Sequence, residues 1–436
     1  MSPPIQKSTP PRAASGSPAA APSRWRQLAL LSGLISMDNS ETSVLSTLFP
    51  ALRAALGLPL SALGLLVAVG KLMWMLFGPV WVVVAQRFGR KNVLVVCCGL
   101  WGLWTCAAGL AQNFTQMLVL CTIAAAGFAG GGPLVNGILA DLFGDSSRGR
   151  AAGVLYGGVA LLTAVVGPLM GQLSRIPDGW RYGFFISGGI TVIFGVLVWR
   201  FFDDPAVGAA DHPASAGIRP AGTVRLSRRD IRELLAGRTL RLILLQRLTS
   251  TQFAFVTFGV VYLVSVRGFS NAVASLVIPF AYLSYVAGTV SGGIISDRAQ
   301  RRFPRTGRLA AWQAATLGWG VLAVLGTQIA WPSIWAYAGV FAILGFLQGF
   351  PPGANRPIVM AVTRPEQRGA AFALLLSVES AGWALGTLII SNLGDLIGLQ
   401  ATFLWLVAGL NIANGLFMTL IYRHYLRESN QIKEIR

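Results

Sequence analysis

The sequence is poor in charged residues and in cysteine, and it has only two histidines. Charged residues make up 12% of the chain, about half of the roughly 25% found in soluble domains. The four cysteines fall inside apolar runs and the histidines stand apart, so the sequence offers neither a disulfide framework nor the ligand spacing of a zinc site. Most of the chain is therefore expected to lie out of water.

The sequence also lacks the motifs of an enzyme. It contains no nucleophile–base pair, no metal cluster and no phosphate-binding loop. The net charge of +19 comes from basic residues scattered through short loops, which is the pattern of membrane topology signals and not of a nucleic-acid surface. We expect no enzyme activity, no cofactor and no nucleic-acid partner.

Long apolar runs take the place of these features. Hydrophobic residues make up 54% of the chain, and they gather in runs of about 20 residues, the length that crosses a bilayer as a helix. Helices satisfy their own backbone groups in lipid, which open strands cannot do. We predict an all-α membrane protein with twelve transmembrane helices in two six-helix bundles, with spans at 28–50, 60–85, 92–112, 115–141, 150–173, 181–202, 239–264, 271–296, 309–328, 333–362, 369–394 and 400–424.

Polar segments divide these spans into five parts. The linker ends in LSRRDIRELLAG, whose helical spacing predicts an amphipathic helix on the cytoplasmic membrane surface, with a solvated linker helix as the alternative. The expected parts are a disordered tail, the N-terminal bundle, the linker, the C-terminal bundle and a second tail, at 1–26, 27–202, 203–238, 239–424 and 425–436.

The basic residues predict how the chain is oriented. With the N-terminus placed inside, 28 of the 35 Lys and Arg residues lie in the tails and the inside loops, and only four lie in outside loops. Such a bias sets topology. We expect a multi-pass protein of the bacterial plasma membrane, with both termini cytoplasmic and no cleavable signal peptide.

Two loops carry a resemblance to a known family. VVVAQRFGRKNVL follows the second predicted span and GGIISDRAQRRFPRTGR follows the eighth. Both are similar to the signature loop of the major facilitator superfamily, except that Gln86 stands at the position of the family aspartate in the first copy. The matching residues are Arg87, Gly89, Arg90 and Lys91 in the first loop and Gly293, Asp297 and Arg298 in the second.

The resemblance implies a cytoplasmic gate built from these residues. A carboxylate can cap a neighbouring helix end and pair with a guanidinium, so that it latches the two halves together. Because Gln86 is neutral, we expect Asp297 to contribute more to the gate than its counterpart in the first loop. The alternative is that these basic residues are topology markers only.

Within the superfamily, the first half resembles the spinster-type transporters. The matching pieces are Gly64-Leu65-Leu66, Asp141-Leu142-Phe143 and Gly179-Trp180-Arg181. The sequence departs from that branch in the fourth span, where Cys121 and Phe128 stand at the positions of a family arginine and glutamate. The departure weakens the expectation of spinster-like proton coupling through that span.

Six ionisable residues lie inside predicted spans. A charge at the bilayer centre costs about 2.5–3.5 kcal/mol on insertion scales, so each must face a cavity or a partner. Carboxylates close together raise each other's proton affinity, which makes the acidic residues candidates for proton coupling. These are Asp38, Glu41 and Glu379; the candidates for substrate contact or charge pairing are Lys71, Arg247 and Arg356.

The sequence allows more than one partner for these charges. Glu379 is expected to pair with Arg356 or Lys71, and Arg247 is expected to contact a substrate anion or a carboxylate of the first span. In the superfamily fold, spans 1, 4, 7 and 10 line a central cavity. Together, these sequence features predict a monomeric, proton-coupled secondary transporter of a small organic anion, zwitterion or amphipath, surrounded by membrane lipid. A drug or metabolite/proton antiporter is the alternative.

Overall fold

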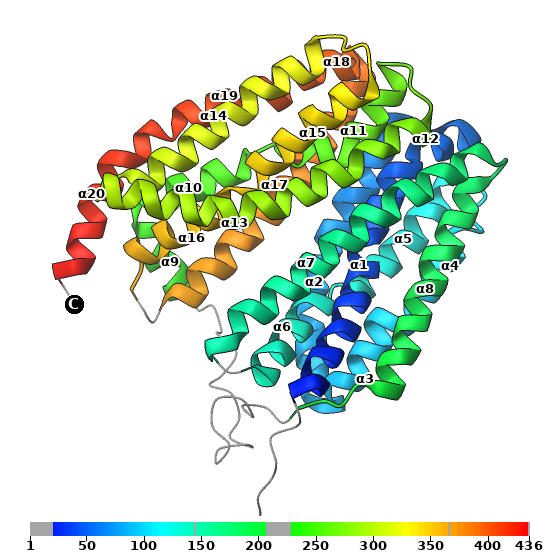
Figure 1. Cartoon of the computed structure of the whole chain (residues 1–436), viewed down its shortest axis with the longest axis horizontal. Helices are drawn as coiled ribbons and strands as arrows, with labels where there is room; N and C mark the ends of the chain where they lie inside the picture. The colour runs from blue at the N-terminus through cyan, green and yellow to red at the C-terminus, as the bar shows by residue number, and fades with distance from the viewer. Residues whose placement is uncertain (1–20, 144, 206–227, 365–366, 435–436) are drawn as a thin grey trace, which may run out of the picture.

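The computed structural model of the protein describes residues 21–143, 145–205, 228–364 and 367–434, and every regular element in these ranges is a helix. Figure 1 shows two helical bundles, one from each half of the chain. The first contains α1 Ala21–Leu56, α2 Leu60–Phe88, α3 Arg90–Leu94, α4 Gly102–Ala108, α5 Phe114–Phe128, α6 Gly131–Leu142, α7 Asp145–Gln172 and α8 Gly179–Phe201.

The second bundle is built in the same way from the C-terminal half, after the short helix α9 Arg228–Ala236. Its helices are α10 Arg238–Leu248, α11 Ala254–Ser265, α12 Asn271–Ala274, α13 Ile278–Arg302, α14 Gly307–Gln328, α15 Ile334–Gly349, α16 Pro351–Val362, α17 Arg368–Ile397, α18 Leu399–Thr402, α19 Leu410–Phe417 and α20 Thr419–Glu434. α20 continues the last span beyond residue 424, into the segment expected to be a tail.

The number of spans agrees with the sequence prediction. Ten helical stretches in the described part of the chain are long and apolar enough to cross a membrane. The other two spans are α1, whose apolar piece is Ser43–Leu56, and the broken seventh span, whose apolar piece is α11. The prediction of twelve transmembrane helices in two six-helix bundles is therefore confirmed.

The seventh span breaks between α10 and α11, and two buried asparagines of the last span hydrogen-bond to residues beside the break. The Asn411 Nδ2 donates to the Thr251 hydroxyl at 2.6 Å, and that hydroxyl donates to the Val407 carbonyl at 3.1 Å. The Asn414 Nδ2 donates to the Gln246 carbonyl at 2.9 Å. A helix can break at membrane depth only where other groups satisfy its freed N–H and C=O groups. The break is thus held by the last span.

The tenth span is divided into α15 and α16, and Pro351 begins the second helix directly after Phe350. Proline removes a backbone donor and clashes with the preceding turn, so a continuous helix is disfavoured there. α16 carries Arg356, and its buried face packs against the C-terminal bundle through Ala354 and Ile358.

A glycine in the fourth span allows close packing against the third span. Gly127 lies under the Trp101 ring, so close that a Cβ there would be 2.0 Å from the ring. The Trp101 Nε1 donates to the Ile123 carbonyl at 2.7 Å. Small residues let helices approach closely in lipid, so this glycine serves packing between spans 3 and 4.

The two halves touch at one end. α2 packs against α17, and α7 packs against α12 and α13. The Gln172 Nε2 donates to the Ala272 carbonyl at 3.2 Å, and Gly171 lies against Ser275. In Figure 1 the two bundles diverge toward α6 and α9, away from this contact. The contacting end is the one that the basic residues predict to be extracellular.

Candidate functional site

An ion pair joins two of the predicted charges inside the C-terminal bundle. The Arg247 Nε on α10 donates to the Glu379 Oε1 on α17 at 2.7 Å, and the two side chains are 17% and 28% exposed. The Arg247 Nη1 is buried without a hydrogen-bond partner among the described residues. Glu379 therefore pairs with Arg247, and not with the Arg356 or Lys71 expected from the sequence. The pair balances both charges at membrane depth.

Arg356 is an exposed residue of α16. The phenol of Tyr285 on α13 is within electrostatic range of Arg356, Arg247 and Glu379, so three predicted site residues gather around one side chain. Within the described ranges, Arg356 makes no hydrogen bond or ion pair with another side chain. Its guanidinium is thus a cation that the described protein leaves uncompensated.

Lys71 lies on the other side of the interface between the halves. Its Nζ is 4.2 Å from the centroid of the Trp383 ring on α17 and 5.3 Å from that of Trp74 on its own helix. Trp383 in turn stacks on Phe253, with centroids 5.3 Å apart and rings 19° from parallel. A cation over an indole face is attracted by the ring quadrupole. Lys71 therefore links the two halves one helical turn from Glu379.

The two carboxylates of the first span belong to α1. α1 runs without a break through positions 38 and 41, but the side chains of Asp38 and Glu41 lie outside the described residues. Their shared helix face follows from their spacing alone. Their assignment to proton coupling stays a prediction.

The residues of the predicted cytoplasmic gate make contacts within their own halves. Arg90 pairs with Asp141 at the end of α6 and, at 2.8 Å, with Asp204 beyond α8. Arg87 lies over the ring of its neighbour Phe88. The contacts of Arg90 tie the start of span 3 to the ends of spans 4 and 6. Gly89 has a φ of +85°, which L side chains rarely adopt, and it separates α2 from α3.

The second signature loop behaves in the same way. Asp297 at the end of α13 accepts from the Arg308 Nη2 on α14 at 2.7 Å. Gly293 lies beside the backbone of Gly353, so α13 and α16 approach closely there. Lys91 is half-buried and Arg298 is exposed. In this conformation the loop joins helices of one bundle, and its gating role stays a prediction.

Three residues at the interface were not singled out from the sequence: Trp383, Tyr285 and Asp395. Trp383 and Asp395 fall on the same every-fourth-residue ridge of α17 as Glu379. That periodicity was the signal available, but an aromatic residue in a span and a carboxylate near a span end are both common. Only the placement of α2 beside α17 gives them a role.

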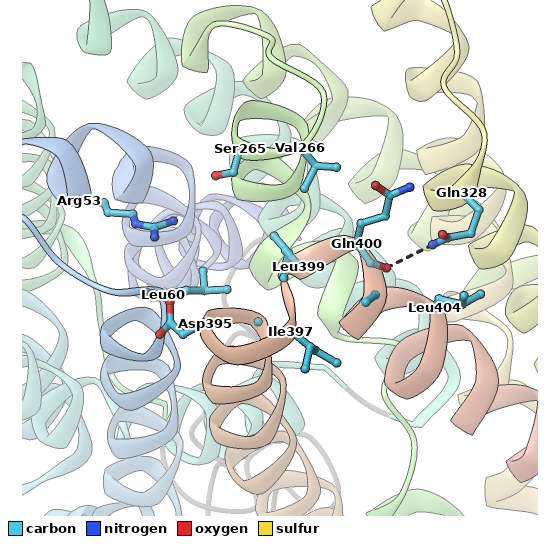
Figure 2. Close-up of a pocket in the computed structure, with 13 residues that line it drawn as sticks. Arg53, Leu60, Ser265, Val266, Gln328, Asp395, Ile397, Leu399, Gln400 and Leu404 are labelled. Carbon is cyan, nitrogen blue, oxygen red and sulfur yellow. Dashed lines mark hydrogen bonds between the residues drawn. The ribbon is translucent and has the colours of Figure 1, made fainter.

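A cavity of about 670 Å³ opens at the contacting end of the bundles, away from Arg356. Figure 2 shows Arg53, Leu60 and Asp395 on one side of it and Gln328 and Gln400 on the other. Its polar groups are largely committed to the protein. The Arg53 Nε donates to the Leu58 carbonyl at 3.0 Å, and the Gln328 Nε2 donates to the Gln400 carbonyl at 3.2 Å. This cavity is a depression over the closed end and not the charged site.

The chain is similar in sequence to bacterial transporters of organic acids. It is 28% identical over 328 residues to the cis,cis-muconate transport protein of Acinetobacter baylyi, covering 72% of this chain and 74% of that protein. It is 25% identical over 295 residues to the hexuronate transporter of Bacillus subtilis, covering 64% of this chain and 65% of that protein. A probable galactarate/D-glucarate transporter of Escherichia coli is 25% identical over 307 residues, covering 65% of this chain and 67% of that protein.

Solved structures share the fold at lower sequence identity. A bacterial homologue of the human lysosomal transporter Spinster, in an inward-facing and unoccupied conformation, superposes with a TM-score of 0.72 at 21% identity, covering 96% of this chain and 99% of that one. A D-xylose–proton symporter superposes with a TM-score of 0.67 at 15% identity, covering 92% and 97%. At these identities the likeness shows the fold alone.

The family follows from the sequence as well as the fold. Residues 29–325, more than half of the chain, match the model of the Major Facilitator Superfamily. The relatives with this fold are transporters and not enzymes, as the sequence predicts. The chain is a multi-pass membrane protein, and it belongs to the major facilitator superfamily of transporters.

Proposed function

We propose that the protein is a secondary active transporter of a small organic anion, coupled to protons and working by alternating access. The observation that carries the proposal is Arg356. It is an exposed arginine within a membrane span, and it pairs with no other described side chain. An arginine at this depth must face water or a ligand and not lipid. Carboxylates suit it best, because the planar guanidinium binds them through two hydrogen bonds.

The neighbourhood of Arg356 favours an anion over a neutral ligand. Glu379 compensates Arg247 at 2.7 Å, so it leaves one positive charge near Tyr285. The Tyr285 hydroxyl can donate to the same ligand. The site would then hold one net positive charge until a carboxylate neutralises it.

The relatives agree with this substrate class. Muconate, hexuronate, galactarate and glucarate all carry carboxylate groups, and they name the cargo of the relatives described above. For this chain we infer the shared chemistry, a small carboxylate, and none of these compounds individually.

Proton coupling would act through the carboxylates near the anion site. Glu379 holds Arg247 only while it is ionised, so its protonation would leave Arg247 as a second uncompensated cation in the site. Asp38 and Glu41 on α1 are the other candidates. A proton and an anion change the balance between inward- and outward-facing states only if they bind the two states unequally.

A ligand-stabilisation screen tests the anion site. The purified protein is heated in detergent with a panel of mono- and dicarboxylates, together with their uncharged methyl esters. We expect a subset of the acids, and none of the esters, to raise the melting temperature. Arg356→Gln should raise the acid concentration needed for the same rise in melting temperature roughly 30-fold. This corresponds to a lost charged hydrogen bond of about 2 kcal/mol.

The matched control is Arg364→Gln. Arg364 lies just past the end of α16 and makes an exposed ion pair with Glu233 at 3.3 Å, so its loss removes the same charge without touching Arg247, Glu379 or Tyr285. Equal stabilisation by acids and esters would contradict the proposal and favour an amphipath or drug transporter. Equal weakening by both variants would contradict the role of Arg356.

A further inference from the structure

The seam between α2 and α17 crosses from one half of the protein to the other. Residues at every fourth position of α17 form a ridge, and four of them contact α2: Trp383, Thr387, Ser391 and Asp395. Ser391 and the Thr387 carbonyl lie against Gly64, so closely that a Cβ on Gly64 would be 1.9 Å from the Ser391 oxygen. The seam therefore runs from the Lys71–Trp383 contact to the closed end of the bundles.

Asp395 completes a helix that belongs to the other half. Its two carboxylate oxygens accept from the backbone N–H groups of Leu60 and Ser61, at 2.8 and 2.7 Å. These are the first two N–H groups of α2, which have no partners within their own helix. Pro59, which precedes them, supplies no side-chain cap. A carboxylate is the favoured group at this position because the N-terminus of a helix is partially positive.

The cap can exist only while the two halves are together at this end. If α17 moves away, α2 loses the acceptors for both N–H groups, and the carboxylate loses its two donors. The cavity of Figure 2 borders Asp395 and Leu60, so water is close enough to take their place when the seam opens. The contact is thus specific to one conformation and needs no ligand.

At the opposite end, no described carboxylate caps a helix of the other half. There the family signature places a carboxylate, but this chain has Gln86, which is exposed, and the gate residues that the structure describes bond within their own halves. Glu428 does cap α10 there, through the backbone N–H groups of Arg238 and Thr239, but both helices belong to the C-terminal bundle. Among the described residues, a carboxylate cap that joins the two halves is therefore found only at the end that carries Asp395.

We propose that the Asp395 carboxylate is the latch that holds this end of the transporter closed, and that with Gln86 opposite it the resting state is open on the side of α6 and α16. The latch is a gating residue of the transport cycle and does not contact the substrate. It acts by stabilising one of two states, so its removal shifts their ratio.

Site-specific labelling tests the latch without any substrate. A cysteine is introduced at Thr387, which is fully buried in the seam, and a membrane-impermeant maleimide is added to right-side-out vesicles. We expect Asp395→Asn to raise the labelling rate about fivefold, the fold-change that corresponds to roughly 1 kcal/mol for the loss of a negative charge at a helix N-terminus. The protein without the Thr387 cysteine gives the background from its native cysteines.

The matched control is Asp178→Asn. Asp178 lies at the same end of the protein and is 65% exposed, and among the described residues its ion pair is with Arg181 of its own half. Its φ of +54° is tolerated by asparagine. This variant removes the same charge without touching the seam, so its labelling rate should equal that of the parent.

Hydrogen exchange separates a latch from a general loss of folding. In Asp395→Asn, amide exchange should speed up in peptides at the start of α2 and the end of α17, and it should stay the same or slow down at α6 and α16. Faster exchange in every span, or unchanged labelling and exchange, would overturn the proposal. Because neither measurement uses a substrate, both outcomes are independent of the organic-anion proposal.

Discussion

Glu379 and Arg247 form an ion pair in the charged site, so the charge of Arg247 is compensated and that of Arg356 is not. The Arg247 Nε is 2.7 Å from the Glu379 Oε1, while Arg356, which shares with them the electrostatic neighbourhood of Tyr285, has no ion pair among the described residues. The pair can change its charge by taking up a proton, and the lone arginine can hold an anion.

The Arg247–Glu379 pair should behave as one unit. Glu379→Gln and Arg247→Gln should each lower the free energy of unfolding by about 1–3 kcal/mol, since each leaves a partly buried charge without its partner. The double variant should lose less than the sum of the two, because it leaves no orphaned charge. Thermal melts of the three variants in detergent measure this. Strictly additive losses would show that the two residues do not interact.

Trp383 should be replaceable by another aromatic residue but not by an aliphatic one. Trp383→Phe keeps a ring face for the Lys71 ammonium and for Phe253, whereas Trp383→Leu removes it. A cation–π contact is worth about 0.5–2 kcal/mol, so we expect Trp383→Leu to change the transport rate by roughly three- to thirtyfold and Trp383→Phe by much less. Initial rates in proteoliposomes decide this, and equal rates in the two variants would refute it.

Gly64 should tolerate no side chain while Ser391 faces it. Gly64→Ala places a Cβ 1.9 Å from the Ser391 oxygen and 2.7 Å from the Thr387 carbonyl, so we expect loss of transport. Ser391→Gly in the same protein should restore part of it by removing the first clash. Gly70→Ala on the same helix is the control, since its Cβ would be 3.8 Å from that of Ala125. Loss of transport in Gly70→Ala, or no loss in Gly64→Ala, would contradict the packing of the seam.

The carboxylates of the first span should control the pH dependence of transport. If Asp38 or Glu41 takes up the coupled proton, Asp38→Asn or Glu41→Gln should flatten the curve of uptake rate against pH. The neutral side chain imitates the protonated state at every pH. Uptake is measured with the internal and external pH varied separately. If each variant keeps both the rate and the pH profile of the parent, α1 does not carry the coupling.

The sequence predicted the spans well because the cost of burying polar backbone in lipid is local and large. It did not predict the break between α10 and α11, because a broken span needs partners from elsewhere. Those partners, Asn411 and Asn414, lie in the last span. They are visible in the sequence only as two polar residues among many apolar ones.

The charged residues of the site were visible in the sequence, but their pairing was not. Six ionisable residues stood out against their apolar spans, yet which of them meet depends on the rotation and depth of each helix. Glu379 was expected to face Arg356 or Lys71, and it faces Arg247. Asp395 went unnoticed because its role depends on the N-terminus of α2, which is distant in the chain.

A transport assay tests most directly whether the protein moves an organic anion with protons. Proteoliposomes containing the protein are given the carboxylate that stabilises it most in the screen, under an imposed pH gradient, and uptake of the labelled acid is followed. We expect uptake that depends on the gradient, that collapses with a protonophore, and that Arg356→Gln reduces while Arg364→Gln does not. Gradient-independent uptake, or equal uptake in both variants, would contradict it.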